Sequence, residues 1–145
     1  MIEHTKRRNL NRGYMKLEVW HESIALYKIT WQIAIDAKVD FKIRSQVADA
    51  AQSVPSNVAE GYSRRSIKEY IQHLYVAAGS LSELFSRMIA LKEGKQISEE
   101  GFEALDALHY QVENKLLNLI KSLEHKRDSG SCIDRVTEGT IEYGR

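Results

Sequence analysis

Residues 53–70, SVPSNVAEGYSRRSIKEY, place the only proline of the chain inside a run that keeps helical spacing. Apolar residues recur at steps of three or four on both sides of the proline, at Val47, Ala51, Val54 and Val58. A proline that ended a helix would break the register of this stripe, and the register is unbroken. We therefore expect a helix over residues 41–60. It should be kinked at Pro55, which cannot donate to the Ala51 carbonyl, and closed by Gly61 as a left-handed cap.

Three further apolar stripes with helical spacing flank this segment. They predict helices over residues 19–38, 67–93 and 99–126. The S-x-x-E capping box of Ser66 and Glu69 opens the third helix, Gly94 ends it, and Ser98 precedes the fourth. The stripe of the first helix is Trp20, Ile24, Tyr27, Trp31 and Ala34. Because no strand pattern is present, we predict an all-α fold, an antiparallel up-down-up-down four-helix bundle.

The composition is that of one ordinary globular domain. The chain has 145 residues, 43% of them hydrophobic and 28% charged, with a formal net charge of +1. A nucleic-acid site would therefore require local clustering of cations. Cys132 is the only cysteine, which excludes an internal disulfide and suits a reducing cytoplasm. We find no membrane-spanning apolar run or signal peptide, so we expect no membrane partner. The expected parts are a basic arm (1–16), the bundle (17–126) and a flexible tail (127–145).

The expected third helix carries more apolar residues than one core stripe requires. Its main stripe is Ile67, Ile71, Leu74, Ala78, Leu81, Phe85 and Met88. Beside that stripe lie Tyr70, Ala77, Leu84 and Leu91. Two explanations stay open: these four residues form an interface of a homo-oligomer, or the helix is centrally packed and needs a broad stripe.

The motifs give no support to an enzyme or a metal site. Glu18 and His21 form E-x-x-H, and Asp106 and His109 form D-x-x-H, which is the type of pattern that di-iron bundles use. Trp20 takes the core side of the first helix, so Glu18 and His21 are expected at solvent or an edge. A lone His109 in an apolar stripe is more often a hydrogen-bonded core residue than a ligand. We predict no catalytic residue, no metal and no cofactor.

Three segments resemble the four-helix bundle proteins encoded in intervening sequences of bacterial 23S ribosomal RNA genes. They are LEVWHESIALYK (17–28), SQVADAAQSVPSNVAEGYSRRSIKEYIQHLYVAAGSLSEL (45–84) and LLNLIKSL (116–123). The resemblance implies a left-handed antiparallel bundle, often assembled as a homopentamer, with no established catalytic activity. A related branch contains accessory proteins of diversity-generating retroelements, which bind a reverse transcriptase and nucleic acid.

The family motif falls on residues around the proline. Its positions here are Ser53, Pro55, Ser56, Asn57, Glu60 and Gly61. We favour a structural role, in which the hydroxyl and amide groups satisfy backbone groups loosened by the kink and Glu60 meets a helix end or an arginine. A ligand or partner pocket at the kink is the alternative. Gly79 is interpreted as a point of close helix approach.

Cations cluster at two places. They are Arg64, Arg65 and Lys68 in the turn, and Lys6, Arg7, Arg8, Arg12 and Lys16 in the arm. With Tyr62 and Tyr70 beside the turn, these cations could hold a phosphate backbone while the aromatic rings stack on bases. A solvated turn is the alternative, and a ring of subunits would present several such turns on one rim. Two functions stay open: an RNA-binding assembly factor, or a scaffold that docks a partner such as a reverse transcriptase.

Overall fold

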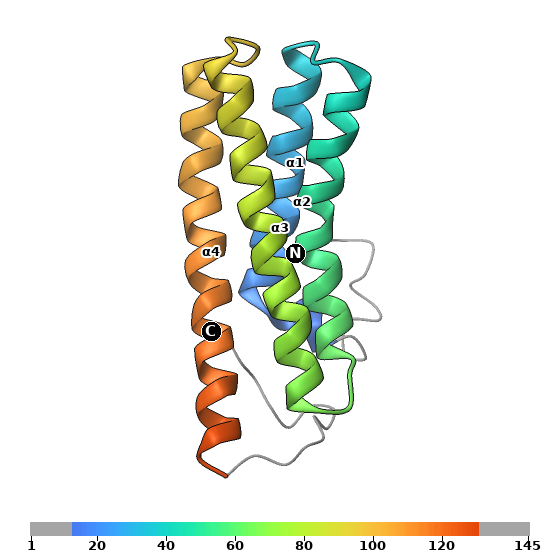
Figure 1. Ribbon diagram of the computed structural model, residues 1–145, viewed down its shortest axis with the longest axis vertical. Coiled ribbons are helices and arrows are strands. Elements are labelled where there is room, and N and C mark those ends of the chain that lie inside the picture. The colour runs from blue at the N-terminus through green and yellow to red at the C-terminus, as the bar shows by residue number, and fades with distance from the viewer. Residues whose placement is uncertain (1–12, 131–145) are drawn as a thin grey trace.

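The computed structural model describes residues 13–130, where the chain is all-α and contains no strand. The elements are a 3-10 turn, η2 (Gly13–Lys16), and the helices α1 (Glu18–Asp36), α2 (Phe41–Tyr62), α3 (Ile67–Glu93) and α4 (Glu99–Asp128). The helices lie side by side with their connecting turns at alternate ends (Figure 1). Helices consecutive in sequence pack together and α4 packs on α1, so the bundle is four-sided. The predicted all-α bundle is confirmed, and its left-handed twist stays a prediction.

Local side-chain caps account for the accuracy of the predicted helix starts. Ser66 and Ser98 each accept a hydrogen bond from the backbone N–H three residues on, at 3.1 and 2.9 Å. Asp40 caps α2 in a similar way, accepting from the Lys42 N–H at 3.1 Å. Each observed helix starts within one residue of its prediction and ends within two.

The surplus apolar residues of α3 belong to the core of the bundle. Tyr70, Ala77 and Leu84 are 0% exposed and Leu91 is 4% exposed. The prediction that these four residues form a subunit interface is therefore wrong, because a buried side chain has no surface left to offer a second chain. The physical reason is that α3 packs against both α2 and α4, so its buried face spans two adjacent seams.

The buried face of α1 is rotated from the one that the apolar spacing predicts. Trp31 is 37% exposed, whereas Ser23 and Thr30 are fully buried. Both hydroxyls donate to carbonyls of their own helix, Ser23 to Trp20 at 2.8 Å and Thr30 to Leu26 at 2.7 Å. This local bonding lets the small polar residues face the core without an unsatisfied donor.

Neither Gly61 nor Gly79 has the role that the sequence predicts. Gly61 lies inside α2, which continues to Tyr62 and is capped by Ser63 in a right-handed conformation, so the predicted left-handed cap is wrong. A Cβ atom on Gly61 would lie 2.8 Å from the Cβ of His73 and 3.2 Å from the Tyr70 carbonyl oxygen. A Cβ on Gly79 would meet nothing within 4 Å. The close helix approach is therefore at Gly61, between α2 and α3.

By length and hydropathy alone, α3 could cross a membrane. The core helix of a soluble bundle passes the same test, so this property is weak evidence for a membrane span.

Alanine substitutions should separate the two glycines. Gly61→Ala should lower the free energy of unfolding by about 1–3 kcal/mol, because the new methyl group meets atoms near the α3 backbone that cannot turn aside. Gly79→Ala should raise it by about 0.5–1 kcal/mol, because alanine favours the helix and the site is open. Urea unfolding followed by circular dichroism measures both changes. Equal effects of the two substitutions would contradict the close approach at Gly61.

Candidate functional site

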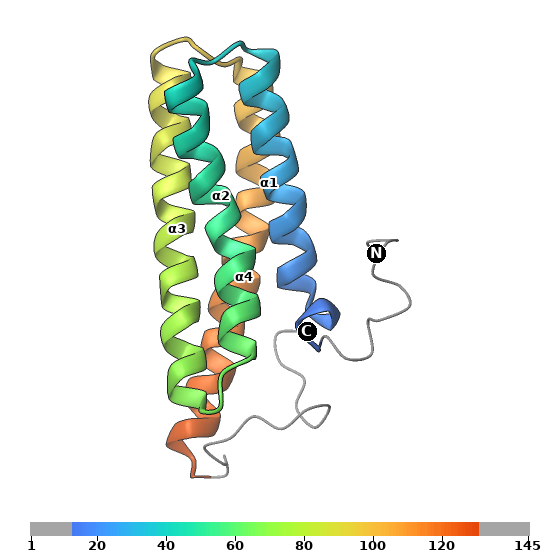
Figure 2. The ribbon, with the colours of Figure 1, turned by 90° about the vertical axis from the view of Figure 1, so that its right-hand side faces the viewer.

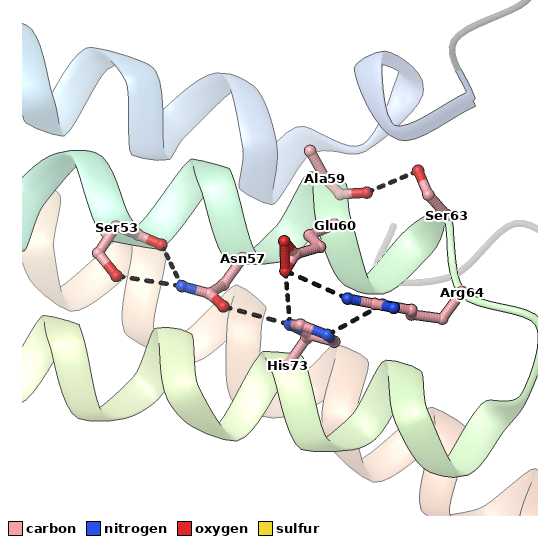
Figure 3. A network of polar contacts seen from close by, with 7 residues as sticks. All are labelled: Ser53, Asn57, Ala59, Glu60, Ser63, Arg64 and His73. Carbon is pink, nitrogen blue, oxygen red and sulfur yellow. Dashed lines mark hydrogen bonds and ion pairs between the residues drawn. The ribbon is translucent and has the colours of Figure 1, made fainter.

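The polar side chains around Pro55 form hydrogen bonds that tie α2 to itself and to α3. The Asn57 side-chain amide donates to the Ser53 carbonyl at 2.8 Å and to the Ser53 hydroxyl at 3.1 Å (Figure 3). The Ser56 hydroxyl donates to the Gln52 carbonyl at 3.0 Å. From α3, the Ser80 hydroxyl donates to the Ser53 hydroxyl at 2.8 Å. The two backbone acceptors, the carbonyls of Gln52 and Ser53, directly follow Ala51, whose carbonyl Pro55 cannot bond.

His73 of α3 joins this network to the basic turn. The Arg64 Nε donates to His73 Nε2 at 3.1 Å, so Nε2 must be an acceptor and the ring proton lies on Nδ1. His73 Nδ1 in turn lies 3.3 Å from the Asn57 side-chain oxygen and 3.5 Å from a Glu60 carboxylate oxygen. Glu60 also pairs with Arg64 at 3.5 Å (Figure 3). The family motif and the basic turn are thus joined by one cluster of polar contacts. We call this cluster the His73 network; it consists of Ser53, Asn57, Glu60, Arg64, His73 and Ser80.

The three cations of the turn are therefore not equivalent. Arg64 is held between a carboxylate and an imidazole, and its charge is offset by Glu60. Arg65 and Lys68 are exposed at the end of the bundle. A phosphate backbone would meet Arg65 and Lys68 first, with Arg64 mainly positioning the turn. Sequence reasoning did not separate them, because His73 lies nine residues from Arg64 and follows no motif spacing.

The aromatic residues near the turn are unsuited to stacking on bases. Tyr70 is 0% exposed and Tyr62 is half-buried, and their ring centroids are 5.9 Å apart in an edge-to-face arrangement. The expectation of exposed aromatics at this place is therefore wrong. Both rings are packing elements between the end of α2 and the start of α3.

The basic arm begins next to the basic turn. η2 packs against both α1 and α2, and a side chain on Gly13 would collide with the Tyr62 ring. Tyr62 is the last residue of α2, so Gly13 lies beside the end of the helix that leads into the basic turn. The last turn of α4 at the same end of the bundle carries further basic residues (Figure 1). Lys6, Arg7, Arg8 and Arg12 lie outside the described residues.

Three of the four suspected metal ligands, His21, His109 and Glu18, have other partners. His21 Nε2 bonds the Met15 carbonyl at 2.6 Å, and His109 Nε2 bonds the Leu81 carbonyl at 2.7 Å. Glu18 binds the Lys115 amino group of α4 at 2.6 Å, and Glu22 binds it as well. The hydrogen bond to Glu18, followed by that to Glu22, raises the pKa of Lys115. Within residues 13–130 no three His, Cys, Asp or Glu side chains come together as a metal site.

The structure contains a groove between α3 and α4 that the sequence analysis does not predict. Its volume is about 350 Å³ and it is lined by Ser82, Phe85, Ser86, Ile89, Asp106, His109, Tyr110 and Glu113. The lining comes from the outer faces of two helices that are close only in the folded bundle. Asp106 and His109 of the D-x-x-H motif are among its lining residues, but that motif did not predict a groove.

Comparison with known proteins gives one family and one fold. The model of the 23S rRNA-intervening sequence protein family matches residues 15–118. The crystal structure of a protein of unknown function from the S23 ribosomal protein family of Bacteroides thetaiotaomicron VPI-5482 is similar, with a TM-score of 0.65 and 19% sequence identity. The match covers 71% of this chain and 98% of that one. At this identity the likeness shows the fold alone. No curated protein matches the chain.

Removal of the Asn57 side chain should test the structural role of the His73 network. Asn57→Ala should lower the free energy of unfolding by about 1–3 kcal/mol, because half-buried groups of Ser53 and His73 lose their partner. Ser63→Ala is the matched control, since its exposed hydroxyl only donates to the Ala59 carbonyl at 3.0 Å, and should change stability by less than about 0.5 kcal/mol. Thermal and urea unfolding measure both. A neutral Asn57→Ala would contradict a structural role.

Proposed function

Because the chain belongs to the 23S rRNA-intervening sequence protein family, we propose that it is a non-enzymatic, homo-oligomeric bundle protein that binds RNA. The observation that carries the proposal is that Gly13, the first described residue, lies against Tyr62 at the end of α2, next in sequence to the basic turn. The family is named after intervening sequences of 23S rRNA, and this association supports RNA as the nucleic acid that is bound.

The side chains of the turn between α2 and α3 are suited to binding the phosphate backbone and not to recognising bases. Arg65 and Lys68 are exposed, and the segment 63–68 contains no acidic residue. The aromatic rings at the turn are packed, so base stacking contributes little. Binding should therefore be weak per subunit, steeply salt-dependent and tolerant of sequence. An oligomer would present several such turns to one RNA and raise the apparent affinity through multivalency.

Titration of ribosomal RNA fragments at several salt concentrations tests the proposal. Arg65→Ala/Lys68→Ala should weaken binding and lower the magnitude of the log-log salt slope by roughly 1.4–1.8 for two lost phosphate contacts at 0.7–0.9 each. Deletion of residues 1–12 should remove much of the remaining binding. Arg64→Ala should have a smaller direct effect than Arg65→Ala, because Glu60 already offsets its charge.

Lys28→Ala/Lys38→Ala is the matched control, since both side chains are exposed and away from this end. It should bind like the wild type. If the control and Arg65→Ala/Lys68→Ala weaken binding equally, or if the wild type does not bind at low salt, the basic turn is only solvated.

A protein-interaction scaffold is the second candidate, favoured by the exposed apolar side chains of the bundle. Phe41 is 71% exposed and Tyr110 is 64% exposed. A partner enzyme such as a reverse transcriptase could use such surfaces. Gene context separates the two candidates: an open reading frame within a ribosomal RNA gene favours RNA binding, and one beside a reverse transcriptase and a variable repeat favours the scaffold.

A further inference from the structure

An arginine surrounded by exposed apolar side chains marks the outer face of α1 and α2. Phe41 is 71% exposed, Ile35 40% and Trp31 37%. The Arg44 guanidinium carbon lies 5.7 Å from the Trp31 ring centroid and 5.6 Å from that of Phe41. We call these four residues the Arg44 patch. Trp, Phe and Arg are the side chains that dominate the energetics of protein interfaces.

Arg44 lacks an acceptor for part of its guanidinium. Its Nε is buried and has no hydrogen-bond partner among the described residues. The two aromatic faces attract its charge but accept no such bond in the plane of the guanidinium. Of the guanidinium nitrogens only Nε is both buried and unpartnered, and the positive charge faces two aromatic rings and no carboxylate among the described residues. A carboxylate brought by a binding partner would pair with that charge. The occupant of this patch should therefore carry a carboxylate beside apolar surface.

The α3–α4 groove has that chemistry. Asp106 and Glu113 contribute two carboxylates to its lining, and no Lys or Arg is among the lining residues. Phe85, Ile89 and Tyr110 supply apolar surface, and Tyr110 is 64% exposed. We call this the acidic groove. It complements the Arg44 patch in both charge and polarity.

The patch and the groove lie at the same level on opposite sides of the bundle. The Arg87 side chain of α3 donates to Gln46 of α2 at 3.1 Å, so the groove residues 82–89 are level with Arg44, two residues from Gln46. α1 packs on α2 and α4, and α3 packs on the same two helices, so the α1–α2 face is opposite the α3–α4 face (Figure 2). One copy of the chain cannot bring these two surfaces together.

We propose that the Arg44 patch of one copy docks in the acidic groove of the next, with the Arg44 guanidinium bound by Asp106 and Glu113 and with Trp31 and Phe41 against Tyr110 and Ile89. This contact is head-to-tail, because two patches would oppose two guanidinium groups and two grooves would oppose four carboxylates. Repetition of such a contact gives a ring when the rotation closes. The inference specifies the oligomer assumed in the proposed function and does not depend on RNA binding.

Two charge-reversed proteins test this pairing. Arg44→Glu removes the patch and keeps the groove, whereas Asp106→Lys/Glu113→Lys removes the groove and keeps the patch. Native mass spectrometry and sedimentation at tens of micromolar, without RNA, should show an oligomer for the wild type and a monomer for each variant. An equimolar mixture of the two variants should assemble beyond the monomer again, because the native patch of one variant meets the native groove of the other and the introduced glutamate meets the introduced lysines.

Lys121→Glu is the control, an exposed charge reversal on α4 away from both surfaces, and should assemble like the wild type. Circular dichroism should show that all variants are folded. A monomeric wild type, an Arg44→Glu variant that still assembles, or a mixture that stays monomeric would each overturn the inference. The RNA titration of Arg65→Ala/Lys68→Ala is an independent measurement. The proposal of RNA binding and the proposal of the contact between copies can therefore be refuted separately.

Discussion

The missing N–H of Pro55 is the constraint around which the α2–α3 half of the bundle is arranged. A proline inside a helix removes one backbone donor and crowds the carbonyl four residues earlier. Ser56 and Asn57, the two residues after the proline, donate their side chains to the Gln52 and Ser53 carbonyls, which directly follow the Ala51 carbonyl that Pro55 cannot bond. The side-chain oxygen of Asn57 contacts His73, and the Ser53 hydroxyl accepts from Ser80. The polar residues beside the proline therefore also bind α2 to α3. α3 can lie this close to α2 because Gly61 has no side chain.

The sequence predicted the bundle because periodicity and capping are local properties. Ser66 caps α3 through an N–H three residues away, and no distant contact is needed to recognise it. Burial depends instead on the neighbours that a helix meets. Tyr70 is buried because α3 faces two helices, and Thr30 is buried because its hydroxyl bonds the Leu26 carbonyl. Neither fact follows from apolar spacing, which is why the core faces of α1 and α3 were only partly predicted.

The candidate site was predicted by residue type and not by geometry. The sequence marked Arg64 and Arg65 as a basic pair, yet only the structure shows that Glu60 and His73 hold Arg64. The junction of Gly13 with Tyr62 joins positions far apart in the chain, so no motif spacing could reveal it. The same limit applies to the acidic groove, whose lining comes from two helices.

The proposed assembly and the proposed RNA binding would use different parts of the molecule, and this separation has a geometric consequence. The Arg44 patch and the acidic groove share one level, so copies joined through them with parallel bundle axes would stand side by side with little axial offset. Bundles related by rotation about an axis along their length keep the same end on the same side. In such an assembly every basic turn would lie on one rim. Cations that are few in a single chain of net charge +1 would then be gathered where several turns can meet one RNA.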